Sequence, residues 1–235
     1  SDLHGVEQAM DFLTHNNKFV DEQINAHLDR YNAKDKNIIV IGGGDTGSDC
    51  IGTCNRHGAC SVVNFELSHK PGKNRDSSNP WPYWPFTLKT TSSHQEGVSR
   101  EWSILTKKFT GDKNNNLIGI ETVNVEIDKI TGKLTEIPNS NKTWKCDMVI
   151  LALGFTGPEE SLPNLLDIDM DNRGNISSNS DYQTKKNNIF TAGDCRRGQS
   201  LIVWAISEGR EASYHIDKYL MGKSSLPRKN SYGDL

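Results

Sequence analysis

The sequence predicts an α/β fold: a three-layer domain with a mostly parallel sheet, followed by part of a second domain built on the same strand-then-helix plan. Residues 37–66 show a complete β-α-β pattern. The continuous apolar run at 147–155, closed by glycine, is typical of a buried parallel strand. A short apolar strand at 188–194 leads into a helix candidate at 201–220, which repeats the pattern.

Composition favours a globular protein of one or two domains. The chain has 235 residues, a net charge of -3 and 34% hydrophobic residues, so nothing in it indicates a nucleic-acid partner. No apolar run approaches the roughly 18 residues of a membrane span, and the N-terminus lacks the pattern of a signal peptide. We therefore expect a soluble intracellular protein without a membrane partner, with cytoplasmic and organellar locations left open.

The cysteines and histidines indicate no metal site. The five cysteines are odd in number and include no C-x-x-C pair, so we expect reduced thiols. Cys50 and Cys54 lie one helical turn apart and are better explained as small buried helix residues than as ligands. No pair of the seven histidines has metal-ligand spacing with a carboxylate.

Two helical candidates precede the β-α-β unit. Val6, Met10 and Leu13 fall on one face of a helix at 6–13, and a weaker helix is expected around Glu22–Tyr31.

The strand at 37–41 runs directly into a glycine-rich turn of the form Gly-x-Gly-x-x-Gly. Gly42 allows the sharp turn, Gly44 allows close backbone approach to a pyrophosphate, and Gly47 allows helix and strand to pack. The following helix, expected over 48–57 and stopped by Gly58, points its N-terminus at the negative charge. We therefore predict a dinucleotide site on these consecutive residues: Gly42, Gly43, Gly44, Asp45, Thr46 and Gly47. The alternative is an ordinary strand-turn-helix without a ligand.

Glu66 ends the second strand of the unit, roughly 20 residues past the glycines, where an acidic side chain binds the ribose hydroxyls. A carboxylate accepts hydrogen bonds from free hydroxyls and repels a 2′-phosphate, so Glu66 favours NADH over NADPH. Against this, Lys70, Lys73 and Arg75 follow closely and are placed to fold back onto a phosphate.

The chain beyond Glu66 changes character. Residues 71–85 form an irregular loop rich in proline and aromatic residues, which we expect to dock on its own domain rather than on a nicotinamide or a neighbouring domain. Alternating residues at 117–127 and a second strand at 134–137 indicate a β-hairpin or meander insertion. Pro158–Pro163 suggests a domain boundary near Gly157.

A second candidate site follows the strand at 188–194. Asp194 is placed to accept a hydroxyl hydrogen bond from a ribityl or ribose chain, or else to cap a helix. The helix that begins near Ser200 points its positive end toward the same region. Arg196 and Arg197 either contact a phosphate or flavin or are solvated.

Two sites in this order, with Ala152-Leu153-Gly154 between them, resemble the paired-domain flavin disulfide-reductase-type oxidoreductases. The similarity is closer to the NAD(P)H- and FAD-binding region of the glutamate synthase family, the small-subunit-like region of the NADH-dependent type. It extends over nearly the whole chain and is carried by these segments: 5–6, 9–13, 40–58, 63–67, 79–85, 94–96, 105–109 and 192–210. Glu66-Leu67-Ser68 stands where the NADPH-using bacterial form tends to carry arginines.

The resemblance implies the roles of the second site. FAD would meet Asp194 through its ribityl chain, and its pyrimidine edge would meet the amides of Gln199, Ser200 and Leu201. Gly154 and Gly193 are also expected among the cofactor-binding residues. His94 would meet the nicotinamide or only cap a helix. No general acid, base or nucleophile is nominated, because the cofactors carry the chemistry.

One departure from the family stands out: the earlier glycine motif that binds FAD and the iron–sulfur cysteines are not in this sequence. We therefore expect a fragment that binds NADH more readily than FAD. The expected parts are a helical segment connecting from the flavin domain, an NAD(P)H-binding domain, the C-terminal part of an FAD-binding Rossmann-like domain, and a polar tail, at 1–31, 32–157, 158–222 and 223–235 respectively.

The implied activity is hydride transfer from NADH to FAD, which supplies electrons for making glutamate from glutamine and 2-oxoglutarate. The implied partners are the iron–sulfur and amidotransferase/synthase regions of the enzyme. The alternatives are another NAD(P)H–FAD oxidoreductase of the same group, such as a ferredoxin-type or dihydropyrimidine dehydrogenase-like enzyme, and a non-catalytic nucleotide-binding or docking module.

Overall fold

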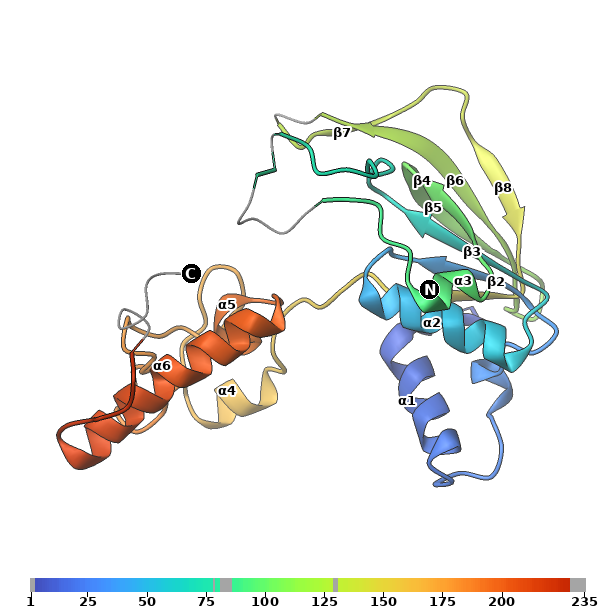
Figure 1. Cartoon of the computed structure of the whole chain (residues 1–235). Coiled ribbons are helices and arrows are strands. Elements are labelled where there is room, and N and C mark those ends of the chain that lie inside the picture. Colours follow the sequence, from blue (N-terminus) through green and yellow to red (C-terminus); the bar gives the residue numbers. More distant parts are fainter. Residues whose placement is uncertain (1–2, 78, 81–85, 129–130, 229–235) are drawn as a thin grey trace. The chain divides into compact units, whose positions relative to one another are not determined.

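The computed structural model describes residues 3–77, 79–80, 86–128 and 131–228. The chain divides into two compact units, one up to Gly154 and one from Phe155 onward, and each is described by itself (Figure 1). Among the described residues, none of the helices is long and apolar enough to cross a membrane.

The first unit is built on a parallel five-stranded sheet with the strand order β1-β9-β2-β3-β4. Its strands are β1 (Val6–Gln8), β2 (Asn37–Ile41), β3 (Ser61–Glu66), β4 (Ser99–Trp102) and β9 (Met148–Leu151). The three central strands were predicted from their apolar runs, and the structure confirms them. β1 and β4 are edge strands that the sequence did not indicate.

Both faces of this sheet are covered, which explains why its central strands are continuously apolar. Helices α1 (Ala9–Val20) and α2 (Asp45–His57) cover one face, where Phe12 and Ile51 pack on Val40. The other face packs on a second sheet, with Ile39 and Phe65 against Ile120. Burying each such side chain stabilises the fold by about 1.5–3 kcal/mol. The unit therefore has three layers, α/β/β, as Figure 1 shows.

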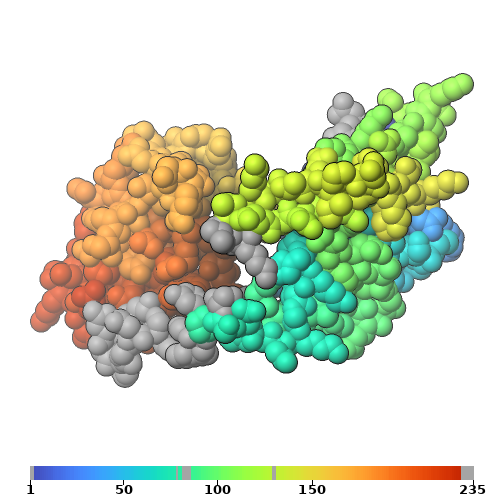
Figure 2. Space-filling view, turned by 90° about the horizontal axis from the view of Figure 1, so that it is seen from above, coloured from blue at the N-terminus to red at the C-terminus, as the bar shows by residue number. Residues whose placement is uncertain are grey.

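The second sheet of this unit is antiparallel and contains β5 (Ile104–Gly111), β6 (Leu117–Ile127), β7 (Leu134–Glu136) and β8 (Lys142–Lys145). The predicted hairpin is confirmed, since β6 and β7 pair antiparallel. In Figure 2, β3 and the segment after it (teal) lie beside this sheet (green to yellow).

Three expectations in the first unit were wrong. Residues 6–8 form β1 rather than the start of a helix, because they pair in parallel with β9. The helix expected at 22–31 is reduced to a 3-10 turn, η1 (Asp29–Tyr31). α2 begins at Asp45, three residues earlier than expected, because Gly44 already takes the N-cap position. Its end at Gly58 is confirmed, with φ of 85°. A short helix, α3 (Ser92–Gln95), was not predicted.

The second unit contains α4 (Ser161–Leu165), α5 (Asp194–Arg197) and α6 (Ile202–Met221). The predicted long helix is confirmed as α6. The strand expected at 188–194 is not formed, because Phe190 makes only a single bridge with Gln183 among the described residues. A strand requires a hydrogen-bonded neighbour along its length, and a local apolar run does not provide one.

Candidate nucleotide-binding sites

The glycine turn between β2 and α2 is shaped by backbone contacts. Gly42 has φ of +120°, and a Cβ there would stand 2.1 Å from the carbonyl oxygen of Ala152. A Cβ on Gly47 would stand 2.2 Å from the carbonyl oxygen of Gly42. Both positions therefore exclude side chains, the first because of its left-handed backbone as well as its contacts.

A buried asparagine of β3 holds the same turn through hydrogen bonds to its backbone. Asn64 of β3 is fully buried, and its Nδ2 donates to the carbonyl oxygens of Val40 at 3.1 Å and Gly42 at 2.9 Å. The sequence analysis missed this residue, although a polar residue in the apolar run 62–65 was a signal for it.

The N-terminus of α2 is open to a ligand. Gly44 is exposed, no side chain among the described residues caps the helix, and a Cβ on Gly44 would meet nothing within 4 Å. Asp45 is exposed and Thr46 is half-buried in the first turn. First-turn N–H groups without a side-chain acceptor and an uncovered glycine suit an approaching pyrophosphate, so the residues present fit a dinucleotide.

The carboxylate of Glu66 lies directly over Gly43. A Cβ on Gly43 would stand 2.1 Å from Cδ and 2.2 Å from Oε2 of Glu66, so only glycine leaves room for this carboxylate. Oε1 of Glu66 accepts a hydrogen bond from Nη2 of Arg100 at 2.7 Å, within an ion pair that is mostly buried. Arg100 was not predicted, because it lies on the edge strand β4, for which the sequence offered no signal.

His94 serves as a cap in α3. Its Nδ1 accepts from the backbone N–H of Thr91 at 3.1 Å, and its own backbone N–H donates to Oγ1 of Thr91. Thr91 in turn lies 2.6 Å from the hydroxyl of Ser48 on α2, measured between the two oxygens. His94 therefore caps α3, while its contact with a nicotinamide stays a prediction. The hydrogen bond between Thr91 and Ser48 joins this capped turn to the helix that follows the glycine turn.

Two of the basic residues after β3 that were considered as phosphate ligands contact protein groups. Lys70 Nζ lies 4.7 Å from the ring centre of Trp102, and Arg75 donates to the carbonyl oxygen of Asn79 at 3.0 Å. Most of the tryptophan–proline run falls on residues 81–85, which lie outside the described residues, so its predicted docking stays a prediction.

The second candidate site surrounds α5 and the start of α6. Gly193 is the N-cap of α5, so Asp194 is not the cap but the first helical residue, and its side chain is exposed. Gln199 and Ser200 are exposed, and Gln199 donates its side-chain amide to the carbonyl oxygen of Phe155. Leu201 is the N-cap of α6, and no side chain caps this helix. The uncapped amides and the exposed carboxylate fit the edge and hydroxyls of a flavin.

A buried carboxylate organises this segment. Glu208 of α6 has 2% exposure, and its Oε2 accepts from the backbone N–H of Gly193 at 2.9 Å. Its Oε1 accepts from Arg196 at 3.0 Å and Arg197 at 2.9 Å. The sequence analysis left Arg196 and Arg197 open between contact with a phosphate or flavin and exposure to solvent, whereas the structure pairs both with Glu208, to which the sequence analysis assigned no role.

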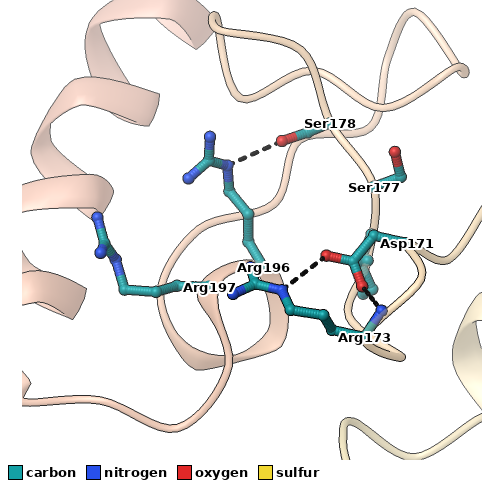
Figure 3. A pocket seen from close by; sticks show the side chains of 7 residues that line it. Asp171, Arg173, Ser177, Ser178, Arg196 and Arg197 are labelled. Carbon is teal, nitrogen blue, oxygen red and sulfur yellow. Dashed lines mark hydrogen bonds and ion pairs between the residues drawn. The ribbon is translucent and has the colours of Figure 1, made fainter. Parts of the chain in front are cut away.

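A pocket of about 290 Å³ lies beside these arginines (Figure 3). In it, Arg196 Nε donates to the hydroxyl of Ser178 at 2.8 Å, and Arg173 Nε lies 3.8 Å from a carboxylate oxygen of Asp171. Three guanidinium groups therefore border the pocket, with Glu208 and Asp171 as their acidic partners.

The cofactor-binding roles predicted for six residues stay predictions: Gly154, Gly193, Asp194, Gln199, Ser200 and Leu201.

Known proteins resemble this chain over most of its length. It is 45% identical to glutamate synthase [NADH] of Schizosaccharomyces pombe over 96% of the chain and 11% of that protein. It is 39% identical to the glutamate synthase [NADPH] small chain of Mycobacterium tuberculosis over 96% of the chain and 46% of that protein. The chain thus spans less than half of these relatives, and the resemblance noted from the sequence is confirmed.

Solved structures share the fold. FprA of M. tuberculosis in complex with NADPH has a TM-score of 0.66 at 14% identity and covers 94% of this chain and 60% of its own. Thioredoxin reductase of T. acidophilum has a TM-score of 0.57 at 18% identity and covers 93% of this chain and 58% of its own. The sequence also matches the pyridine nucleotide-disulphide oxidoreductase family over residues 2–209. The chain belongs to the pyridine nucleotide-disulphide oxidoreductase family.

Proposed function

We propose that this chain binds NADH at the glycine turn and delivers its hydride to FAD, as the electron-input region of a glutamate synthase. The observation that carries the proposal is the pairing of an uncapped α2 N-terminus with the carboxylate of Glu66 over Gly43. The similarity to glutamate synthases over 96% of the chain supports the same conclusion.

The choice of NADH over NADPH rests on Glu66 rather than on the relatives, whose names include both cofactors. Oε1 of Glu66 is engaged by Arg100, whereas Oε2 has no hydrogen-bond partner among the described residues. An ionised carboxylate with a free acceptor suits the two ribose hydroxyls of NADH and repels a 2′-phosphate.

The residues proposed to hold FAD are Gly193, Asp194, Gln199, Ser200 and Leu201. Asp194 would accept a hydrogen bond from a ribityl hydroxyl, and the first amides of α6 would face the electron-rich edge of the ring. Glu208 supports this arrangement, since it ties Gly193 to α6.

The cofactors, when bound, supply the hydride donor and acceptor. The side chains described here bind and orient them, and we assign none of them a proton transfer. The proposed partners are the iron–sulfur and amidotransferase/synthase regions, through which electrons would reach glutamate formation.

Titration of the purified chain with NADH and NADPH tests the proposal. We expect NADH to bind at least about tenfold more tightly, a difference of about 1.4 kcal/mol, and Glu66→Gln to bring the two dissociation constants within about twofold. Glu136→Gln is the matched control, because Glu136 forms an exposed ion pair with Lys107 on the antiparallel sheet. Equal affinity of the unmodified chain for both nucleotides would contradict the NADH assignment.

A second measurement addresses the flavin. The purified chain is expected to be colourless, because the sequence lacks the glycine motif that binds FAD in the family. A yellow preparation with stoichiometric FAD would show that the second site suffices without that motif.

A further inference from the structure

The ion pair between Glu66 and Arg100 lies where two neighbouring parallel strands end. In the register of β3 and β4, Asn64 is opposite Arg100 and Glu66 is opposite Trp102. Nη2 of Arg100 lies 2.7 Å from Oε1 of Glu66, and the two side chains are only 13% and 12% exposed. At this burial the charge-assisted hydrogen bond between the two side chains is only weakly screened by salt.

The guanidinium of Arg100 also contacts protein groups other than Glu66. Its Nη1 donates to the carbonyl oxygen of Lys89 at 2.8 Å, and its Cζ lies 5.0 Å from the ring centre of Trp102. Its Nε is buried without a hydrogen-bond partner among the described residues. Nη1 and Nη2 each donate to a protein acceptor and Nε is buried, so the guanidinium is held in place beside Glu66.

Only one of the two oxygens of the Glu66 carboxylate has a hydrogen-bond partner among the described residues. Arg100 occupies Oε1, and Oε2 stands over Gly43, 2.2 Å from where a Cβ on that residue would be. The free acceptor is therefore next to the turn that would hold the pyrophosphate of a dinucleotide.

His94 does not compete with Arg100 for this carboxylate. Burial, and after it the charge of Arg100, lowers the pKa of the His94 imidazole, so that the ring is neutral at pH 7. The cation beside Glu66 is thus Arg100 rather than His94.

We propose that Arg100 is a positioning residue that sets nucleotide specificity: it fixes the Glu66 carboxylate over Gly43 so that the site selects a free ribose diol over a 2′-phosphate. This inference rests on the proposed NADH site and deepens it. The opposite role, in which Arg100 binds a 2′-phosphate and admits NADPH, predicts the opposite effect of removing it.

The test measures dissociation constants of Arg100→Met for both nucleotides. We expect NADH to bind about tenfold more weakly, because Glu66 is no longer oriented, while NADPH affinity changes less than about twofold. Arg100→Lys keeps the charge but cannot reach Glu66 and the Lys89 carbonyl together, so it should restore part of the preference. A selective loss of NADPH affinity in Arg100→Met, or an unchanged ratio of the two constants, overturns the inference.

Two further variants serve as controls for Arg100→Met. Arg56→Met removes another Arg–Glu pair, a more exposed one with Glu96 at 2.6 Å, and should leave both affinities unchanged. In a Glu66→Gln background, Arg100→Met should have no further effect on the ratio of the two dissociation constants, because both substitutions act through one carboxylate.

If Glu66→Gln changes this ratio and the Arg100 variants do not, only the inference fails. If the unmodified chain shows no preference, the proposed function fails. Thermal melts verify folding, and Arg100→Lys carries the test if Arg100→Met does not fold.

Discussion

At the scale of single residues, three consecutive glycines are needed for three different reasons. Gly42 is needed for its positive φ and its contact with Ala152, and Gly43 for the space that the Glu66 carboxylate occupies. Gly44 has open space around it, and we propose that glycine is needed there for the close approach of a dinucleotide. The motif is therefore structural at its first position, and its third position is a proposed binding feature.

The difference between Gly42 and Gly44 predicts different effects of alanine substitution on stability. We expect Gly42→Ala to lower the free energy of unfolding by about 2 kcal/mol or more, because a Cβ at φ of +120° would overlap a backbone oxygen. Gly44→Ala should change it by less than about 1 kcal/mol, because its φ of -78° suits alanine, which gains from a less flexible unfolded chain but is a poorer N-cap residue than glycine. Urea unfolding measures both, and NADH titration should show weaker binding in each. Equal stability of the two variants would contradict this assignment.

The glycines and Glu66 were predictable because each belongs to a local pattern with a physical reason. Arg100 and Glu208 were not identified, because their partners, Glu66 and Gly193, are distant in sequence. Asn64 was missed although its place in an apolar run was a signal for it. A pairing across 34 residues leaves no periodic trace in a sequence.

At the scale of elements, the central strands of the parallel sheet were predicted well and the segment before them poorly. The strands at 37–41 and 148–151 are buried on both faces, so their apolar runs are unambiguous. At the N-terminus, the spacing of Val6, Met10 and Leu13 suggested one helix face, yet Val6 is in a strand and Met10 is 48% exposed. Pairing with β9 overrides the local periodicity there.

The C-terminal end of α2 contains a histidine that links it to neighbouring segments. Nδ1 of His57 accepts from the backbone N–H of Ala33 at 3.4 Å, and its Nε2 lies 2.9 Å from Oδ1 of Asn16. Burial, and after it the charges of nearby basic side chains, lowers the pKa of His57 from 6.5 to about 4. Protonation would also remove the acceptor that Ala33 uses.

This packing makes stability depend on pH. Between about pH 6.5 and 4 the unfolded chain binds a proton at His57 and the folded chain does not, so the free energy of unfolding falls as the pH drops through that window. Above pH 6.5 the group has no effect. We expect the Tm of the unmodified chain to fall between pH 7 and 5 by roughly 2–4 °C more than that of His57→Gln. His69→Gln, at an exposed site, is the control. An unaltered pH profile in His57→Gln would refute the role of this ring.

At the scale of the whole molecule, the two units differ in their cores. The first has two apolar clusters, one on each face of its parallel sheet. In the second, the described buried apolar side chains are small, such as Ala212 at 5% exposure, while Ile202 and Val203 of α6 are 75% and 60% exposed. Buried apolar area is the main favourable term in folding, so the second unit is expected to be the less stable.

We therefore expect the second unit to unfold at lower urea than the first. Hydrogen exchange measured by mass spectrometry at increasing urea would follow peptides from each unit separately. NADH at 100 times its dissociation constant should stabilise the first unit alone, by about 2.7 kcal/mol. Coincident loss of protection in both units, or equal stabilisation by NADH, would contradict this expectation.

The sequence by itself determined the α/β class, the β-α-β unit, the glycine turn and Glu66, because these depend on residues adjacent in the chain and on burial periodicity. Only the tertiary structure decided which side chains complete the sites. Strand pairing at the edges brought Arg100 to Glu66, and packing of α6 placed Glu208 beside Gly193. Such contacts form when distant segments are buried together, and no local pattern encodes them.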